Sequence, residues 1–234
     1  MAPFDSLNLG DHVGDVAANV IENRSILQRA LSAKPVFLKQ VHGTHIARLT
    51  AETADGIEAD ACITTQSGVA CTIMVADCLP VLLTNRAGSF VAAAHAGWRG
   101  LAGVNNVGVL EAVVESAQAL ETTASDIMAW LGPCIGATKF EVGAEVRDTF
   151  ASANAAALRH FTPNARGKWL ADLRGLARQR LRAMGITQID GNDGSVAWCT
   201  ASNPSRFFSH RRDSASVGGS VGSTGRMAAC IWLD

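Results

Sequence analysis

Cys78 and His95 are the two residues whose types and spacing most directly suggest chemistry. They lie on apolar segments joined across residues 85–88 (NRAG), whose turn-forming composition predicts a β-hairpin. If Thr84 pairs with Ser89, Cys78 lies opposite His95, and directly opposed side chains share one face with Cβ atoms roughly 5 Å apart. That separation suits either two ligands of one metal ion or a thiolate beside its activating imidazole. A slip of one residue would place them on opposite faces.

Other residues with chemical potential flank this hairpin. Asp77 directly precedes Cys78, where a carboxylate could orient a ligand or act as a base, although accepting backbone hydrogen bonds is the commoner role. His42, in KQVHGTH, follows a strand-like run and precedes a glycine, a position that often presents a side chain to a cleft. Pro80 cannot donate to a strand ladder, so we expect it at an edge or a bulge.

The elements that must position these residues follow from hydrophobic periodicity. Apolar residues after Asp15 recur at the helical period and predict a helix that ends before Pro35. Compact apolar runs predict strands at 36–41, 61–64, 69–75, 90–94 and 129–131. Further periodic runs predict helices at 104–120 and 173–184. Strands and helices without strict βαβ alternation predict an α+β fold, and a length of 234 residues favours a single domain, 1–234.

Composition narrows the class of protein. Twenty basic and twenty-one acidic residues give a formal charge of -1, so no global field would collect nucleic acid or an anionic membrane, and small partners are favoured. The apolar runs are strand-sized, and the N-terminus has neither the basic start nor the apolar run of a secretory signal, so we expect a cytoplasmic protein. The six cysteines are scattered without a CxxC pair, which argues against a disulfide framework and a zinc ribbon.

Several uncommon strings occur in a fixed order from Ser6 to the last residue. They are SLNLGDHVGD, KQVHGTH, ADCLPVLL, HAGWRG, GPCIG, FEVGAEV, FFSHRRD and TGRMA. On these strings the chain closely resembles the YfiH/laccase-domain family, also called the multicopper polyphenol oxidase or purine nucleoside phosphorylase family. Eight strings in order are far more specific than any single short motif.

The resemblance implies both a fold and a metal site. The fold is an α+β domain with mixed β-sheets in layered α/β/β/α packing, related to a toxin class of cysteine hydrolases. In the family, the histidine of QVHG, the cysteine of ADC and the histidine of HAGWRG bind zinc, which implies His42, Cys78 and His95 here. Three protein ligands and an open fourth position are the arrangement of a catalytic zinc.

The resemblance also implies an activity. Relatives cleave adenosine, inosine, guanosine and methylthioadenosine with phosphate and also deaminate adenosine, so this chain is expected to be a zinc-dependent purine nucleoside phosphorylase with adenosine deaminase activity. His42, Cys78, His95 and Asp77 are the expected catalytic residues. Purine nucleosides and phosphate are the expected partners, and basic side chains would hold the phosphate. The candidates for this role are Arg99, Arg211, Arg212 and Arg226.

Two departures from the family pattern stand out. Relatives usually extend further before the SLNLG string, with an arginine and a GGVS-like turn, so we expect this chain to lack a strand and a substrate-binding arginine there. The loop at 214–224 is longer than the usual link between RRD and TGRM. Its Gly/Ser-rich stretch, residues 216–225, has neither a preceding strand nor the P-loop lysine that would make it a phosphate cradle.

Three other readings of the same residues remain. A copper polyphenol oxidase would need many more histidines, largely as His-X-His pairs, than the six in this chain. Without a metal, Cys78 could be a nucleophile and His95 its base in an amidase acting on UDP-muramyl cell-wall precursors. A zinc-stabilised binding protein without turnover would keep the metal and tolerate substitutions around it.

Overall fold

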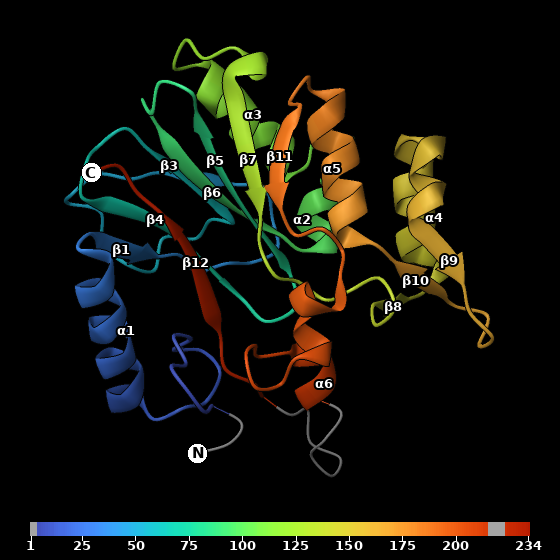
Figure 1. The fold of residues 1–234 in the computed structure, drawn as a ribbon, viewed down its shortest axis with the longest axis horizontal. Coiled ribbons are helices and arrows are strands. Elements are labelled where there is room, and N and C mark those ends of the chain that lie inside the picture. The colour runs from blue at the N-terminus through green and yellow to red at the C-terminus, as the bar shows by residue number, and fades with distance from the viewer. Residues whose placement is uncertain (1–3, 215–222) are drawn as a thin grey trace.

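The computed structural model describes residues 4–214 and 223–234 and contains three β-sheets with helices on either side (Figure 1). One sheet has the order β1-β4-β12, made of β1 (Lys34–Phe37), β4 (Val69–Val75) and β12 (Met227–Ile231). The largest has the order β11-β7-β5-β6-β3-β2, made of β2 (Ile46–Arg48), β3 (Ala61–Thr64), β5 (Leu79–Asn85), β6 (Val91–Ala96), β7 (Ile127–Leu131) and β11 (Gln188–Gly191). A small third sheet joins β8 (Glu141–Val142), β10 (Trp169–Ala171) and β9 (Phe161–Pro163) in that order.

The helices are α1 (Ala17–Leu31), α2 (Trp98–Ala102), α3 (Val109–Gln118), α4 (Ala144–Ala153), α5 (Leu173–Ala183) and α6 (His210–Asp213). Short 3-10 helices are η1 (Ala124–Asp126), η2 (Ala155–His160), η3 (Val196–Trp198) and η4 (Thr200–Ser202). No helix in the described ranges is both long and apolar enough to cross a membrane.

Four layers build the body of the molecule. One apolar cluster lies between the β1-β4-β12 sheet and the six-stranded sheet, the two large sheets of the molecule, and it joins Ile73 of β4 to Ala93 of β6. Helix α1 covers the outer face of the three-stranded sheet, where Leu27 packs near Phe37. Helices α3 and α5 cover the far face of the six-stranded sheet in the largest cluster. This α/β/β/α layering leaves every residue of β4 buried, because both of its faces are covered, and its sequence is accordingly apolar without alternation.

The strands at 61–64 and 69–75 have the predicted bounds, whereas two other predicted elements are too long. The helix expected at 104–120 begins at Val109, because Asn105 and Asn106 adopt left-handed φ angles of 51° and 67° and make a turn instead. The strand expected at 36–41 ends at Phe37. Beyond it, the Gln40 side chain takes over the pairing with β4 through two hydrogen bonds to the backbone of Met74.

The hairpin is present, but its register differs from the prediction by two residues. Thr84 pairs with Val91 rather than Ser89, because Asn85 accepts the Ser89 N–H and closes a longer loop. An even shift keeps the same side chains on the same face, so Cys78 and His95 still share a face. The expectation for Pro80 was wrong, because β5 is a central strand, in which Pro80 pairs with His95 next to the strand's end.

All six cysteines are free thiols, and Cys62, Cys71, Cys134 and Cys199 are buried. Most of the loop predicted at 214–224 lies outside the described residues.

Candidate metal centre and its cavity

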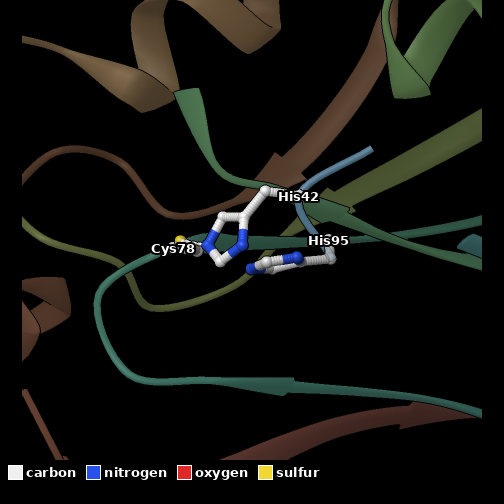
Figure 2. A group of neighbouring side chains, drawn as sticks. All are labelled: His42, Cys78 and His95. Carbon is white, nitrogen blue, oxygen red and sulfur yellow. Dashed lines mark hydrogen bonds between the residues drawn. The ribbon is translucent and has the colours of Figure 1, made fainter. Parts of the chain in front are cut away.

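Three segments bring His42, Cys78 and His95 together (Figure 2). His42 lies in the loop after β1, Cys78 directly precedes β5, and His95 lies on β6. One nitrogen or sulfur atom from each residue lies within 4.8 Å of the other two. The Cys78 Sγ atom is 3.8 Å from His42 Nε2, and the two imidazole rings meet edge to face with centroids 4.7 Å apart.

Backbone strain marks two segments of this cluster. His42 has a φ of 63° and Asp77 a φ of 90°, in the left-handed region that residues other than glycine seldom adopt. Such conformations persist where the surroundings hold them and gather at functional sites. Asp77 is held on both sides, because its carboxylate accepts hydrogen bonds from the Thr200 hydroxyl and the Arg211 N–H, and its carbonyl accepts the Ile135 N–H.

His95 is oriented by a buried carboxylate. Its Nδ1 lies 2.8 Å from the Asp60 Oδ1 atom, and both residues are buried. A proton on Nδ1 donates to this carboxylate, which leaves Nε2 as the nitrogen that can coordinate a metal. Burial raises the pKa of Asp60, but hydrogen bonds from His95 and from the Gly43 N–H outweigh burial and hold that pKa below its ordinary value.

Cys78 and His95 shift each other's ionisation. Burial raises the pKa of Cys78, but the His95 charge and the hydrogen bond with His42 outweigh it and lower that pKa to about 6. Burial lowers the pKa of His95, but the Cys78 thiolate and Asp60 outweigh it and raise that pKa to about 9. At neutral pH, Cys78 is therefore a thiolate, which is the form that binds metals and attacks electrophiles.

The donor set fits a tetrahedral metal ion. With Zn–S near 2.3 Å and Zn–N near 2.05 Å, ligands at the tetrahedral angle lie about 3.6 Å apart, close to the 3.8 Å between Cys78 Sγ and His42 Nε2. One thiolate and two imidazoles are the donor types that zinc sites use. These three residues would hold the ion and leave one coordination position open.

A cavity of about 410 Å³ opens over this cluster. Its apolar wall includes side chains that offer flat or extended surfaces, namely Trp98, Ile135, Phe140 and Leu173. Its polar wall includes, besides the cluster itself, His12, Gln40, Asp77, Arg99, His210, Arg211 and Arg226. The volume is in the range of small-molecule sites, and the mixture of apolar surface with a few convergent polar groups is typical of them.

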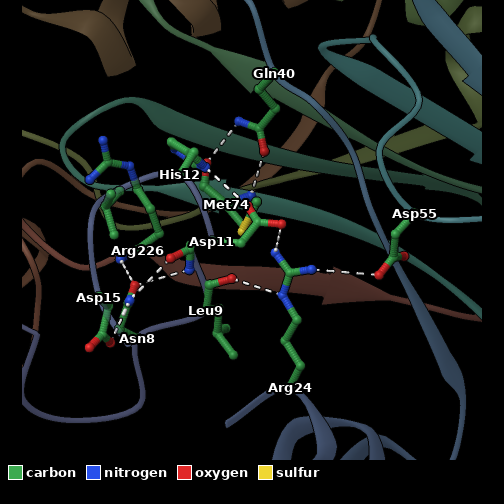
Figure 3. A network of polar contacts seen from close by, with 12 residues as sticks. Asn8, Leu9, Asp11, His12, Asp15, Arg24, Gln40, Asp55, Met74 and Arg226 are labelled. Carbon is green, nitrogen blue, oxygen red and sulfur yellow. Dashed lines mark hydrogen bonds and ion pairs between the residues drawn. The ribbon is translucent and has the colours of Figure 1, made fainter. Parts of the chain in front are cut away.

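Arg226 is partly buried, unlike Arg99 and Arg211, which are exposed. Its guanidinium donates to the carbonyl oxygens of Thr224 and Gly225. Its backbone is held by the N-terminal segment, since the Arg226 N–H donates to Asn8 (Figure 3). The Arg226 carbonyl also accepts the Leu9 N–H. Burial lowers the pKa of Arg226 below its ordinary value, and the nearby Cys78 offsets only part of this lowering.

The other three expected arginines divide. Arg99 and Arg211 line the cavity and are exposed, with Arg99 lying over the Trp98 ring and Arg211 donating to the Glu141 carbonyl. Arg212 lines a different cavity. Its guanidinium donates to the carbonyl oxygens of Thr200 and Phe207 and to the Asp213 carboxylate, so it braces the loop before α6.

Sequence reasoning missed several residues of this site, chiefly Asp60, His12 and Gln40. Gln40 lies in the same KQVHG string as His42, and Asp60 directly precedes a fully buried strand, which is an unusual place for a carboxylate. His12 lies in the SLNLGDHVGD string, but nothing in that string indicated that the N-terminal segment reaches the cavity.

The chain is similar to known proteins along its whole length. The family model described as multi-copper polyphenol oxidoreductase laccase matches residues 1–234. The chain is 48% identical over 234 residues to a purine nucleoside phosphorylase of Pseudomonas aeruginosa and 47% identical over 235 residues to the purine nucleoside phosphorylase YfiH of Escherichia coli, and it spans 88% of each. A crystal structure of a Neisseria meningitidis protein matches with a TM-score of 0.86 and 41% identity, covering 100% of this chain and 89% of that one.

Proposed function

Since this chain belongs to the multi-copper polyphenol oxidoreductase laccase family, whose bacterial relatives above are named purine nucleoside phosphorylases, we propose that it is a zinc-dependent purine nucleoside phosphorylase. The proposed substrates are adenosine, inosine, guanosine and methylthioadenosine together with phosphate. Deamination of adenosine at the same site and a cytoplasmic location are part of the proposal.

One observation carries this proposal. The atoms of His42, Cys78 and His95 that could bind a metal lie within 4.8 Å of one another beside a cavity that has both an apolar wall and arginines. A purine needs a flat apolar surface, and phosphate needs cations, so the two halves of the wall suit the two substrates.

Each part of the cavity has a proposed task. Zinc, when bound, would supply a Lewis acid that attracts an oxyanion or lowers the pKa of water. Arg226 would bind phosphate, with Arg99 and Arg211 at the rim, because guanidinium groups pair well with its oxygens. Trp98 and Phe140 would contact the base and exclude water. Asp77 would act by holding Arg211 and the Thr200 hydroxyl, since both of its oxygens already accept hydrogen bonds.

Chromatography of adenosine incubated with the zinc-loaded protein tests the proposal. Adenine formed only when phosphate is present would establish phosphorolysis, and inosine would establish deamination. The variants His42→Ala, Cys78→Ala and His95→Ala should each lose zinc and turnover while staying folded by circular dichroism. A fully active Cys78→Ala protein would refute the proposal.

A metal-free hydrolase is the second candidate, favoured by the lowered pKa of Cys78 beside His95. It would be an amidase with Cys78 as nucleophile, acting on UDP-muramyl precursors, and it would accord with the expected relation to cysteine-hydrolase toxins. Release of an amino acid from such a precursor by metal-free protein would support it. Loss of that release after zinc is removed would count against it.

Copper chemistry, which the family description names, has less support. A His₂Cys set with an axial methionine is a blue-copper arrangement, but Met74, which borders the cavity, packs its side chain with Leu9 and Phe37 near α1. In the described part of the chain one such group of ligands is found, whereas a multicopper oxidase needs several. Metal analysis of the purified protein discriminates zinc from copper.

A further inference from the structure

We propose that Asp60 is the positioning residue of this metal centre, because its single carboxylate fixes both histidine ligands at once. The inference rests on the proposed role of His42 and His95 as metal ligands. It assigns Asp60 no contact with substrate, and it separates the ligand set into two histidines that depend on Asp60 and a cysteine that does not.

The carboxylate accepts four hydrogen bonds from the two segments that carry the histidines. Its Oδ1 atom lies 2.8 Å from His95 Nδ1 and 2.8 Å from the His42 backbone nitrogen. Its Oδ2 atom lies 2.7 Å from the Gly43 nitrogen and 3.1 Å from the Val41 nitrogen. Three consecutive backbone N–H groups therefore converge on one anion, which is the geometry of a backbone nest.

The backbone of Asp60 ties together the same two segments. Its carbonyl accepts the His95 N–H at 2.8 Å, and its own N–H donates to the His45 carbonyl at 3.0 Å. The side chain of Asp60 is fully buried, so water does not compete for any of these bonds. Asp60 thus links the 41–45 loop to β6 through every polar group that it has.

This cradle explains why His42 keeps a left-handed φ of 63° without being a glycine. A nest around an anion needs N–H groups that turn inward, and the charge-assisted bonds to Asp60 offset the strain of that turn. Without the carboxylate, the three N–H groups would lose their common acceptor and the loop would relax, carrying His42 away from Cys78.

Asp60 also sets which nitrogen of His95 faces the metal. An acceptor at Nδ1 keeps a proton on that nitrogen, so Nε2 is the nitrogen that a metal can bind. Among the described contacts, Asp60 has none with Cys78, which follows the strained Asp77 on a different segment. The two histidines should therefore respond together to a change at Asp60, while the thiolate remains available.

The test compares Asp60→Asn with Asp172→Asn as a matched control. An amide at position 60 must place an NH₂ group against either two backbone donors or the His95 ring, and in the second case the ring proton moves to Nε2 and blocks coordination. Asp172 also accepts a backbone N–H, that of Gly175, and an arginine, Arg174, but it does so at the start of α5. Asp172→Asn therefore removes the same charge from a carboxylate with the same kinds of partner, and it leaves the surroundings of His42 and His95 unchanged.

The readout is binding of Co²⁺ alone to metal-free protein, by competition with a chelator, together with the ligand-field spectrum of the bound ion. Asp60→Asn should weaken Co²⁺ binding by on the order of 10- to 100-fold and change the spectrum, while Asp172→Asn binds like wild type. Equal affinity of Asp60→Asn and wild type, or an equal loss in Asp172→Asn, would overturn the proposal.

A second measurement uses wild-type protein and so does not depend on whether a variant folds. In wild-type protein with ¹⁵N-labelled histidines and bound Zn²⁺, His95 should coordinate through Nε2 and carry a slowly exchanging proton on Nδ1. Coordination through Nδ1, or a fast-exchanging proton there, would overturn the assignment. Neither readout involves a nucleoside, so wild-type protein that binds metal as described but leaves adenosine intact would refute the proposed function alone.

Discussion

Gly97 lies so close to two of the proposed ligands that adding a single methyl group should separate metal affinity from fold stability. A Cβ atom at this position would lie 3.0 Å from Cys78 Sγ and 3.0 Å from His42 Cδ2. Non-bonded heavy atoms prefer about 3.5–4.0 Å, so both side chains would have to move by roughly half an ångström. Metal sites tolerate only about 0.2 Å in ligand distances. Gly97→Ala therefore demands a displacement that the ligands of a bound metal cannot make.

The crowding at Gly97→Ala should cost more free energy in the metal-loaded protein than in the metal-free protein. The Gly97 backbone, with φ of −67° and ψ of 161°, suits alanine, so no backbone strain is added. In metal-free protein the two side chains can move aside, whereas in the loaded protein they cannot. Overpacking costs about 1 to 3 kcal/mol, which as a loss of binding energy weakens zinc affinity about 5- to 150-fold. Unfolding of the metal-free protein should change by less than about 1 kcal/mol.

Gly136→Ala is the matched control for this prediction. A Cβ atom there would lie 3.0 Å from the sulfur of Cys199, a buried cysteine that is not among the proposed ligands. The same crowding should therefore lower the free energy of unfolding and leave zinc affinity unchanged. The assays are chelator competition for zinc and urea unfolding of the metal-free protein. Wild-type affinity in Gly97→Ala, or equal losses of affinity in the two variants, would refute the reasoning.

Three further predictions concern the thiolate, the core and the phosphate. In metal-free protein, alkylation of Cys78 by iodoacetamide should increase as the pH rises through about 6, because the lowered pKa of Cys78 means that the reactive thiolate forms in that range. Bound zinc should protect Cys78 from alkylation. Mass spectrometry measures the alkylation with and without zinc, and a midpoint near the ordinary thiol pKa would contradict this prediction. Leu83→Ala, in the core of β5, should lower the free energy of unfolding by about 2–5 kcal/mol, whereas Val196→Ala, at 69% exposure, should change it by no more than about 0.5 kcal/mol in a urea titration. Arg226→Met should raise the KM for phosphate by about tenfold or more with little change in the KM for adenosine, because one charged hydrogen bond is worth about 1.5–3 kcal/mol; an unchanged phosphate KM would remove Arg226 from the proposed phosphate site.

Strands β3 and β4, one from each of the two sheets that pack face to face, were the most predictable part of the fold. The runs at 61–64 and 69–75 are buried on both faces, so their apolar character alone marks them. The start of α3 was less predictable, because the apolar Val104 and Val107 continue the helical pattern while two asparagines between them turn the chain. Local backbone preference decided that boundary against the hydrophobic pattern.

The hairpin shows which part of a register can be predicted. The assumed turn was wrong by two residues, because Asn85 and Ser89 close a longer loop through their side chains. The shared face of Cys78 and His95 survived because side chains alternate with a period of two, which an even shift preserves. The face on which each side chain lies could therefore be predicted from the sequence, although the exact pairing of residues could not.

The sequence by itself determined the apolar strands, the amphipathic helices, the chemical types of the candidate ligands and the family to which the chain belongs. These depend on the order of residues along the chain. Only the tertiary structure decided that the Asp60 carboxylate accepts the N–H groups of residues 41–43 and faces His95. It also decided that His12 and Arg226 reach one cavity from opposite ends of the chain, and that Arg212 braces a loop elsewhere. These contacts join segments distant in sequence, and the packing of the sheets, which no local pattern encodes, brings them together.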